Sequence, residues 1–461
     1  MVARFALVAL ALLGWSQAYF AGRCAAAETG VPYAISGRIV TEDGARRGWV
    51  VVNRNDGSIM DICDRESEVP PSAIRIRHEG YIFPGLIDTH NHCHWNSIPM
   101  WRSGKLYENR YEWREGEEYD EEVKAARRAI IDAGLDSRSL KYGEIRALVG
   151  GTTMLQGSEV PAPYLVRNLD ESPWRAYSYV EDVTQAPPYY ILQARMGLQY
   201  GIINRLFLHV AEGKSTDPRT QAEFPFVEAV GLTMPGVVII HGVALTPANF
   251  QTMAQNNMYL VWSPKTNLVL YGETADVVTA LGAGVTVALG PDWTISGSDN
   301  LLEELKVAHE YSAKHLGGAI TPRQLFKMAT SDAAKVAGVG SMLGRIAEGY
   351  QADLFLAPRL GPDPFLSLLK TYSKDIELVL IDGKPLYGKR QLMRDLVDPA
   401  ELDVITVSHK KKAIDLIEPG LGPFGLERYD ELIDALEAAI EIAPLIEDEP
   451  EGHPGYPRRL P

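Results

Sequence analysis

Cysteine is scarce in this sequence of 461 residues, which contains only Cys24, Cys63 and Cys93. Three cysteines cannot form the dense disulfide framework of small secreted domains, so the fold has to depend on a buried apolar core. For Cys63 and Cys93 the sequence favours two buried free thiols. A disulfide between them in an oxidising compartment is the alternative.

Positive net charge is also lacking, because the formal charge of the chain is -15 and the one dense basic run, 410–412, is short. Without a basic surface the chain would repel nucleic-acid phosphates, which argues against a nucleic-acid partner. The apolar share of 46% and the charged share of 23% are ordinary for a globular protein. The length and composition therefore allow one large domain with a smaller one, or one barrel that bears insertions, and leave open whether the chain forms a homo-oligomer.

The first 27 residues have the composition of a targeting segment. Arg4 precedes an apolar run at 5–15, and small residues follow at 16–18 and at 25–27. This order is typical of a signal peptide at 1–27, and it predicts export to the periplasm or out of the cell. An uncleaved membrane anchor is the alternative, although the run is short for a bilayer span. No later segment is long and apolar enough to cross a membrane.

Short β-rich runs lie near both ends of the chain. They are at 34–41, 48–52, 74–77, 352–357 and 378–381. Asn-Asp-Gly at 55–57 and Asp-Gly at 382–383 are strong turn signals among them. We therefore predict a small β-sandwich domain built from residues 33–80 and 345–395. A C-terminal extension at 398–461 is expected to pack over the outside or to lie partly free.

Between these ends, in residues 81–344, apolar strand-like runs alternate with helical patterns. The runs lie at 82–89, 152–156, 176–180, 206–210, 237–241, 258–262 and 285–289. This alternation is typical of parallel βα units, and the region is close to the about 250 residues of a (β/α)8 barrel. We therefore predict an α/β fold with a TIM-type barrel. Because one strand is missing, we expect a distortion near the fourth strand, between Val180 and Leu206.

His90 and His92 stand two residues apart at the end of the first of these runs. Side chains two apart in a strand point to the same face, so both imidazoles can reach one ion. Barrel enzymes place their catalytic groups at this end of the strands. Alone, the pair is weak evidence for a metal, because histidines also end strands without binding one.

Three later runs also end in ionisable residues. One ends at His209, with Glu212 three residues on; the others end at His241 and just before Asp292. Burying such groups without partners costs free energy, so core strands have no reason to end this way repeatedly. We therefore expect these side chains to be each other's partners at one end of the barrel.

These residues and three further segments make the chain resemble the amidohydrolase superfamily, nearest the cytosine and guanine deaminases and the triazine hydrolases. The segments are Gly-Thr-Thr at 151–153, Ser-Pro-Lys-Thr-Asn-Leu at 263–268 and Gly-Arg-Ile-Ala-Glu-Gly-Tyr-Gln-Ala-Asp-Leu at 344–354. The resemblance covers residues 33–388. It implies a metal-dependent hydrolase that cleaves a C–N bond of a small molecule, as in deamination or the opening of a cyclic amide.

The resemblance also implies one divalent metal ion held by His90, His92, His209 and Asp292. Zinc is favoured, and iron is the alternative. By the same resemblance His241 faces the attacking water and Glu212 transfers protons. The chemistry agrees, because three imidazoles and a carboxylate leave a coordination position for water. Asp292 can accept the proton of that water, and Glu212 can protonate the leaving nitrogen.

Two-metal members of the superfamily bridge their ions with a carboxylated lysine, which the resemblance would place on the fourth strand. No lysine occurs between Lys141 and Lys214, and this favours a single metal. A bridging carboxylate from Glu159 or Glu181 is left open.

Several neighbouring residues have roles that the sequence leaves open. Asp88 can orient an imidazole, Asn267 can support the site, and His94 is expected to line the pocket or lie on the surface. The aromatic-rich segment at 95–113 is interpreted as pocket wall, with ordinary packing as the alternative.

Two other functions compete with the leading one. The first is an exported dipeptidase or amidase of the same superfamily, against whose two-metal versions the missing lysine argues. The second is a catalytically silent secreted binding protein. Glu212 and His241 argue against it, because they serve turnover rather than metal retention.

Overall fold

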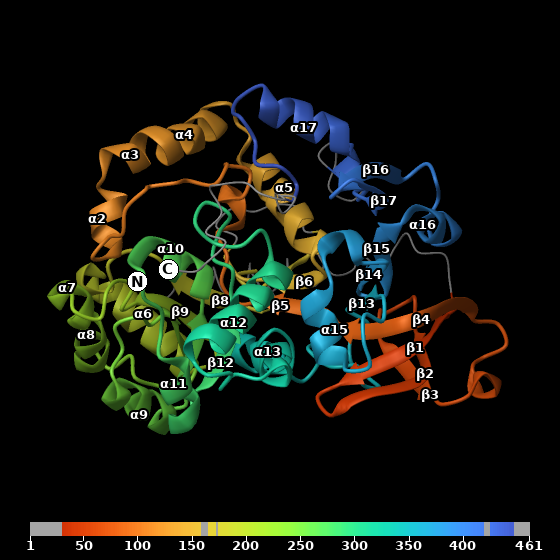
Figure 1. The fold of residues 1–461 in the computed structure, drawn as a ribbon, viewed down its shortest axis with the longest axis horizontal. Helices are drawn as coiled ribbons and strands as arrows, with labels where there is room; N and C mark the ends of the chain where they lie inside the picture. Colours follow the sequence, from red (N-terminus) through yellow and green to blue (C-terminus); the bar gives the residue numbers. More distant parts are fainter. Residues whose placement is uncertain (1–29, 158–164, 172–173, 419–424, 447–461) are drawn as a thin grey trace, which may run out of the picture.

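The computed structural model describes residues 30–157, 165–171, 174–418 and 425–446, which form one α/β molecule (Figure 1). The predicted signal peptide and Glu159 lie outside these residues. Within them, every helix is too short or too polar to cross a bilayer.

One continuous nine-stranded sheet joins the two ends of the chain. From the N-terminal end come β1 (Tyr33–Thr41), β2 (Gly44–Val52), β3 (Ile59–Cys63) and β4 (Ile74–Pro84). From the C-terminal end come β13 (Leu354–Ala357), β14 (Leu378–Ile381), β15 (Lys384–Lys389), β16 (Leu402–Val407) and β17 (Lys410–Asp415). Their order is β16-β17-β15-β14-β13-β4-β1-β2-β3, so the two halves meet where β4 pairs with β13. The sheet therefore takes in part of the segment that the sequence assigns to the C-terminal extension.

The two faces of this sheet follow the alternation of its side chains. Ile35 pairs with Val50, and both enter one buried cluster, whereas the adjacent pair Ala34 and Val51 enters another. Successive strand residues point to opposite faces, so both faces are covered by apolar packing.

Eight short parallel strands form the other two sheets. They are β5 (Leu86–Asp88), β6 (Thr152–Leu155), β7 (Arg167–Asn168), β8 (Ala176–Tyr179), β9 (Arg205–Val210), β10 (Val237–His241), β11 (Tyr259–Trp262) and β12 (Thr286–Leu289). The first three strands form one sheet and the last five the other. The amide and hydroxyl of Thr89 both donate to the Leu289 carbonyl, and the Ala176 amide donates to the Leu169 carbonyl. The two sheets are thus joined at both of their edges.

The predicted position of the irregular strand, between Val180 and Leu206, is wrong. That interval holds the short 3-10 helix η4 (Val183–Gln185) and α6 (Pro188–Gln199), and β9 then begins at Arg205. The irregular strand is β7, which lies upstream and is followed by β8 with no helix assigned in the described residues between them. A two-residue strand that contains an arginine cannot produce an apolar run, so the pattern did not reveal it.

Helices surround the parallel strands (Figure 1). Between β5 and β6 come η2 (Cys93–Trp95), α2 (Arg110–Arg114), α3 (Glu117–Tyr119), the π-helix η3 (Asp120–Lys124), α4 (Ala125–Asp132) and α5 (Asp136–Val149), with α5 leading into β6. The later helices are α7 (Pro218–Gln221), α8 (Glu223–Ala229), α9 (Pro247–Gln255), α10 (Pro264–Tyr271), α11 (Val277–Ala283), α12 (Leu301–His315), α13 (Pro322–Met328) and α14 (Ser331–Ala337). Thr321 caps α13 with its side chain, and Pro322 takes the first helical position, which suits a residue without an amide proton.

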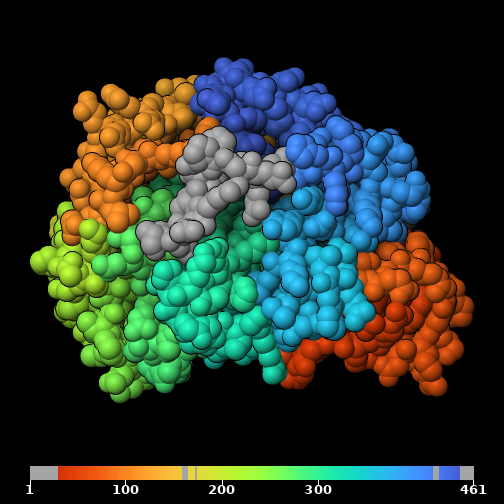
Figure 2. Space-filling model, viewed as in Figure 1, coloured from red at the N-terminus to blue at the C-terminus, as the bar shows by residue number. Residues whose placement is uncertain are grey.

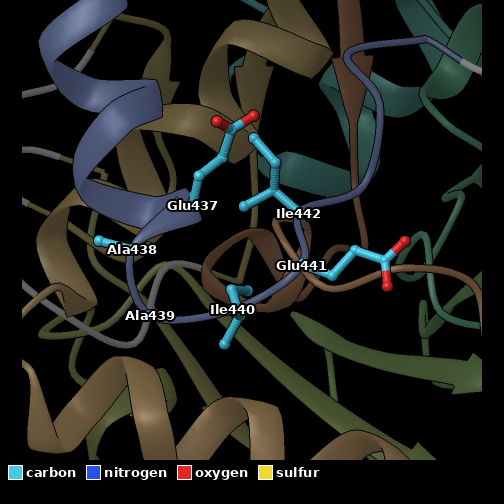
Figure 3. Close-up of a pocket in the computed structure, with 6 residues that line it drawn as sticks. All are labelled: Glu437, Ala438, Ala439, Ile440, Glu441 and Ile442. Carbon is cyan, nitrogen blue, oxygen red and sulfur yellow. The ribbon is translucent and has the colours of Figure 1, made fainter.

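The C-terminal segment packs on the outside of α5. η1 (Glu66–Glu68), α15 (Pro364–Lys370), η5 (Ser373–Asp375) and α16 (Arg390–Leu396) connect strands of the nine-stranded sheet. The last helix of the described residues is α17 (Tyr429–Glu437). The Tyr142 hydroxyl donates to the Ala443 carbonyl at 2.7 Å, and the Ala443 amide donates to the Ser97 carbonyl at 2.8 Å. Figure 2 shows the blue C-terminal elements on the surface, between the orange α2–α4 segment and the red N-terminal strands β1–β4. A shallow hollow at the end of α17 is lined by residues 437–442 alone and contains no histidine (Figure 3).

A buried ion-pair network fastens β7 to the nine-stranded sheet. Arg167 donates to Asp353 at 2.9 and 3.0 Å and to Asp382 at 2.8 Å. Removing one partner of a buried pair leaves the other charge unpaired, so Arg167→Met should lower the free energy of unfolding by about 3–5 kcal/mol in urea titrations. Arg47→Met, which removes an exposed pair with Glu79, is the control and should cost about 1 kcal/mol or less. Equal effects of the two changes would contradict the proposed importance of this network.

Candidate active site

The structure brings together the ionisable residues that end four of the parallel strands. His90 and His92 follow β5, His209 lies in β9, His241 ends β10 and Asp292 follows β12. Parallel strands bring their carboxyl ends to the same edge of a sheet, which is why residues so distant in sequence meet here.

The distances within this group are short. The Oδ1 atom of Asp292 lies 3.0 Å from Nε2 of His90 and 3.4 Å from Nε2 of His92. The ring centroid of His209 lies 4.8 Å from that of His90 and 5.4 Å from that of His92. One ligand atom from each of the three histidines falls within 4.8 Å of the others, which is close enough for one ion to contact all three.

Backbone geometry at the strand ends allows this approach. Gly290 passes so close to β5 that an added Cβ would lie 2.6 Å from the Cβ of His90. Ala211, His241 and Asp292 have φ angles of 58°, 69° and 70°, a left-handed conformation that costs non-glycine residues free energy. Such strain persists where surrounding structure holds it, and it concentrates at functional sites.

The electrostatics of the group favour cation binding. Burial alone would raise the pKa of the Asp292 carboxyl, but His90 and His92 hold that pKa well below its usual range. Burial, followed by the neighbouring His90, lowers the pKa of His209 far below its usual value. An ionised carboxylate and the neutral imidazole of His209 are in the protonation states that metal ligands require.

A buried imidazole nitrogen of this group lacks a hydrogen-bond partner in the part of the chain that the structure describes. Nδ1 of His209 is buried and has no hydrogen-bond partner among the described residues. Leaving a buried polar atom unpaired costs free energy, which a ligand at the site would relieve. The donor set of three imidazoles and a carboxylate suits zinc or another divalent transition metal.

Helix α10 holds the two further predicted residues in place. Tyr271 donates its hydroxyl hydrogen to Oε1 of Glu212 at 2.7 Å, and the Asn267 amide nitrogen lies 3.0 Å from Nδ1 of His241. Positions four apart in a helix share a face, so α10 presents both side chains to the site. The Asn267 oxygen accepts from Thr274, so its NH2 donates to Nδ1 and leaves Nε2 of neutral His241 as the N–H.

Burial lowers the pKa of His241, in keeping with a neutral ring. Its Nε2 lies 3.6 Å from Oε2 of Glu212, which is too long for a hydrogen bond. His241 and Glu212 therefore offer one N–H donor and one carboxylate acceptor to a ligand bound beside the proposed metal ligands.

The sequence missed Arg110 and Tyr271, which both contact Glu212. Nε of Arg110 lies 3.5 Å from Oε2 of Glu212, and Tyr271 in turn accepts from the Trp113 indole at 2.8 Å. Arg110 and Trp113 both belong to α2, a short helix inside the loop after β5. The one local signal was Asn109, whose side chain caps α2 by accepting from the amides of Tyr111 and Glu112.

Aromatic side chains cover the His92 side of the site. Trp293 lies 5.4 Å from His92 and 5.8 Å from Trp113, measured between ring centroids. Tyr119 packs edge-on against Trp113 at 4.9 Å. The aromatic-rich loop after β5 therefore reaches His92 through Trp293, and both interpretations of that loop, pocket wall and ordinary packing, stay predictions.

The residues whose roles the sequence left open are placed as follows. Asp88 accepts from the His90 amide and from the Asn91 side chain, so it fixes the backbone of the loop that carries the proposed ligands. Glu181 has a side chain 61% exposed and pairs with Arg114, which removes it as a bridging ligand. His94 is buried, and Cys63 and Cys93 are buried free thiols.

A buried carboxyl behind the site predicts a pH-dependent stability. Glu223 accepts from the Tyr111 hydroxyl and from the Ala211 amide, both at 2.6 Å. Burial raises the pKa of Glu223 from 4.5 to about 7. The folded state thus binds this proton more tightly, so its contribution is fully present below about pH 4.5 and is lost as the pH rises through about 7.

The loss amounts to about 2–3 kcal/mol between pH 5 and pH 8. Glu223→Gln should therefore show a smaller decrease in the free energy of unfolding over this range, measured by urea titration. Some decrease should remain, because burial also raises the pKa of Glu304 to about 7. Identical pH profiles for the wild type and Glu223→Gln would contradict the prediction.

Part of the chain matches known sequences. Residues 204–386 match the sequence profile of the Amidohydrolase family. A 5-methylthioadenosine/S-adenosylhomocysteine deaminase of Desulfitobacterium hafniense is 30% identical over 203 residues, which are 41% of this chain and 47% of that protein. The corresponding protein of Aquifex aeolicus is 30% identical over 212 residues, 42% of this chain and 48% of its own. The match thus spans about half the length of these curated relatives.

Solved structures resemble a larger part of the chain. A zinc-bound adenosine deaminase from Xanthomonas campestris has a TM-score of 0.65 and 18% identity, and covers 80% of this chain and 94% of its own. Guanine deaminase from E. coli has a TM-score of 0.61 and 17% identity, with coverages of 78% and 100%. A mutant atrazine chlorohydrolase from Arthrobacter aurescens TC1, complexed with zinc and atraton, gives 0.60 and 18%, with coverages of 76% and 95%. At these identities the likeness shows a shared fold.

Proposed function

We propose that this chain, which belongs to the amidohydrolase superfamily as its sequence predicts, is a metal-dependent hydrolase of a C–N bond in a small molecule. The observation that carries this proposal is a set of three overlapping groups at the strand ends: His90 with His92 and His209, His90 with His241 and Asp292, and His209 with Glu212 and His241. The reaction is a deamination or the opening of a cyclic amide, the reaction types that the sequence resemblance implies.

The fold proposed for this activity is a (β/α)8 barrel with an attached β-sandwich. Eight parallel strands in two sheets joined at both edges support the barrel. The irregularity at β7 would be accommodated by its ion pairs to the nine-stranded sheet. That sheet, with apolar clusters on both faces, would curl into the sandwich.

One divalent ion, zinc in preference to iron, is proposed to bind His90, His92, His209 and Asp292. When bound, such an ion lowers the pKa of water toward neutrality and stabilises negative charge on oxygen. Asp292 is ionised and accepts a proton from the attacking water. His241 donates its Nε2–H toward the oxygen that gains charge, and Glu212 carries a proton to the leaving nitrogen.

Export is proposed as well, since the segment at 1–27 has the charge, apolar run and small residues of a signal peptide. Fractionation of cells that make the full chain, followed by N-terminal sequencing of the product, tests this. A product that keeps its first residues and stays in the cytoplasm would refute it.

Metal analysis combined with product analysis tests the activity. Zinc-loaded protein should release ammonia from an aminated heterocycle or open a cyclic amide, and the His209→Ala variant should bind less zinc and lose turnover. Cleavage of dipeptides instead would favour the exported dipeptidase or amidase. Binding of heterocycles without any product would favour the secreted binding protein.

A further inference from the structure

Arg110 is a buried cation at the edge of the proposed reaction centre. Its side chain is 3% exposed, and its amide donates to the Glu212 carbonyl at 3.2 Å. Nε of Arg110 lies 3.5 Å from Oε2 of Glu212, and that oxygen lies 3.6 Å from Nε2 of His241. The guanidinium group therefore lies beside the groups proposed to move protons.

Part of this guanidinium group has no partner in the protein. Nη2 donates to the Val180 carbonyl, but Nη1 is buried and lacks a hydrogen-bond partner among the described residues. An unpaired buried donor costs about 1–3 kcal/mol, and more when it is charged. Arg114 donates to the same Val180 carbonyl from the surface, so the anchoring of α2 does not depend on Arg110 alone.

The charge of Arg110 points to an anionic ligand, an argument that rests on the proposed function because the ligand is taken to be the substrate. Nη1 is a buried, charged donor with no partner among the described residues. Such a donor is satisfied best by a negatively charged acceptor.

We propose that Nη1 of Arg110 binds a carboxylate on the substrate, so that the enzyme acts on small molecules that carry both a hydrolysable C–N bond and an acid group. Arginine is suited to this task because it stays charged when buried and forms strong hydrogen bonds with carboxylates. Trp113 on the same helix faces Trp293 beside Asp292, so the rest of the substrate meets aromatic rings.

Two matched substrate pairs test the proposal on zinc-loaded protein. They are cytosine-5-carboxylate with cytosine-5-carboxamide, and hydantoin-5-acetate with hydantoin-5-acetamide; each pair differs in charge and little in size. The wild type should prefer the acid in kcat/KM by about 100-fold, the size of effect expected of a buried charge pair. Arg110→Met should bring this ratio close to 1, and Arg110→Lys should restore part of it. Arg114→Met is the matched control on the same helix and should keep the wild-type ratio.

Binding measurements separate recognition from the reaction. Calorimetry with indole-3-acetate and indole-3-acetamide, with zinc content measured in every variant, should show the same Arg110-dependent acid preference. If no pair is turned over but this preference holds, the proposed reaction fails and the recognition stands. Equal affinity for acid and amide in the wild type overturns the proposal, as does an acid preference that survives in Arg110→Met. An equal loss for acid and amide also overturns it, because Arg110 would then only position Glu212.

Discussion

Replacing Asp292 with asparagine is expected to lower kcat by about a thousandfold or more and to weaken zinc retention. The carboxylate contacts His90 and His92 through one oxygen and is held in its ionised form beside them. An amide of the same shape has no negative charge to offer the metal and no basic oxygen to accept a proton from water. The change therefore removes both proposed roles while it preserves the volume of the side chain.

Metal analysis and turnover numbers on the same preparations check this expectation. Asp299→Asn is the matched control, because Asp299 lies in the same segment after β12 but pairs with Arg146 at 2.6 Å instead of an imidazole. The control should lose stability and keep its zinc and its kcat. If Asp292→Asn retained full zinc and nearly full kcat, the proposed centre would be in the wrong place.

The meeting of the strand ends was within reach of the sequence because it follows from two general rules. Side chains two apart share a face of a strand, which pairs His90 with His92. Parallel strands end at one edge of their sheet, which adds His209, His241 and Asp292 from distant parts of the chain. Neither rule needs the details of packing, so the apolar runs and their last residues were enough to group these side chains.

The groups that surround this centre could not be predicted from the sequence, because their positions depend on the details of packing. Arg110 comes from a short helix within a long loop, and Glu223 lies in a helix behind the site. Their contacts with Glu212 and Ala211 depend on how those loops fold over the strand ends, and no periodic pattern records that. Tyr271 lies one turn beyond Asn267 in α10, so a helical interpretation of the segment 263–271 would have shown that both face the same way.

The nine-stranded sheet extends beyond the predicted segment 345–395 for another physical reason. β16 lies at its edge and alternates exposed and buried residues toward its end, and its neighbour β17 begins with three lysines, so neither strand has an apolar run. β7 escaped because it has two residues, one of them Arg167. Apolar runs in the sequence reveal strands that are buried on both faces. They do not reveal very short strands or strands near the edge of a sheet.

Glu212→Gln is expected to lower kcat by about 100-fold to 1,000-fold while zinc content stays at the wild-type level. Glu212 contacts Tyr271 and His241 but lies outside the four proposed ligands, so its carboxylate serves the leaving nitrogen rather than the ion. Glutamine keeps the acceptor for the Tyr271 hydroxyl and cannot carry a proton. The fall in rate should therefore appear in kcat with little change in metal affinity, in contrast to Asp292→Asn.

Tyr271→Phe completes this test as a double-mutant cycle, since it removes the 2.7 Å hydrogen bond to Glu212 together with the acceptor of the Trp113 indole. Alone it should reduce kcat by about tenfold, because the carboxylate remains but is oriented less well. Combined with Glu212→Gln it should add little, because residues that act as one unit are not additive. Fully additive effects would mean that Tyr271 acts independently of Glu212. If the Glu212→Gln enzyme lost zinc in proportion to its activity, Glu212 would be a metal ligand. The proton would then have to reach the leaving nitrogen through His241.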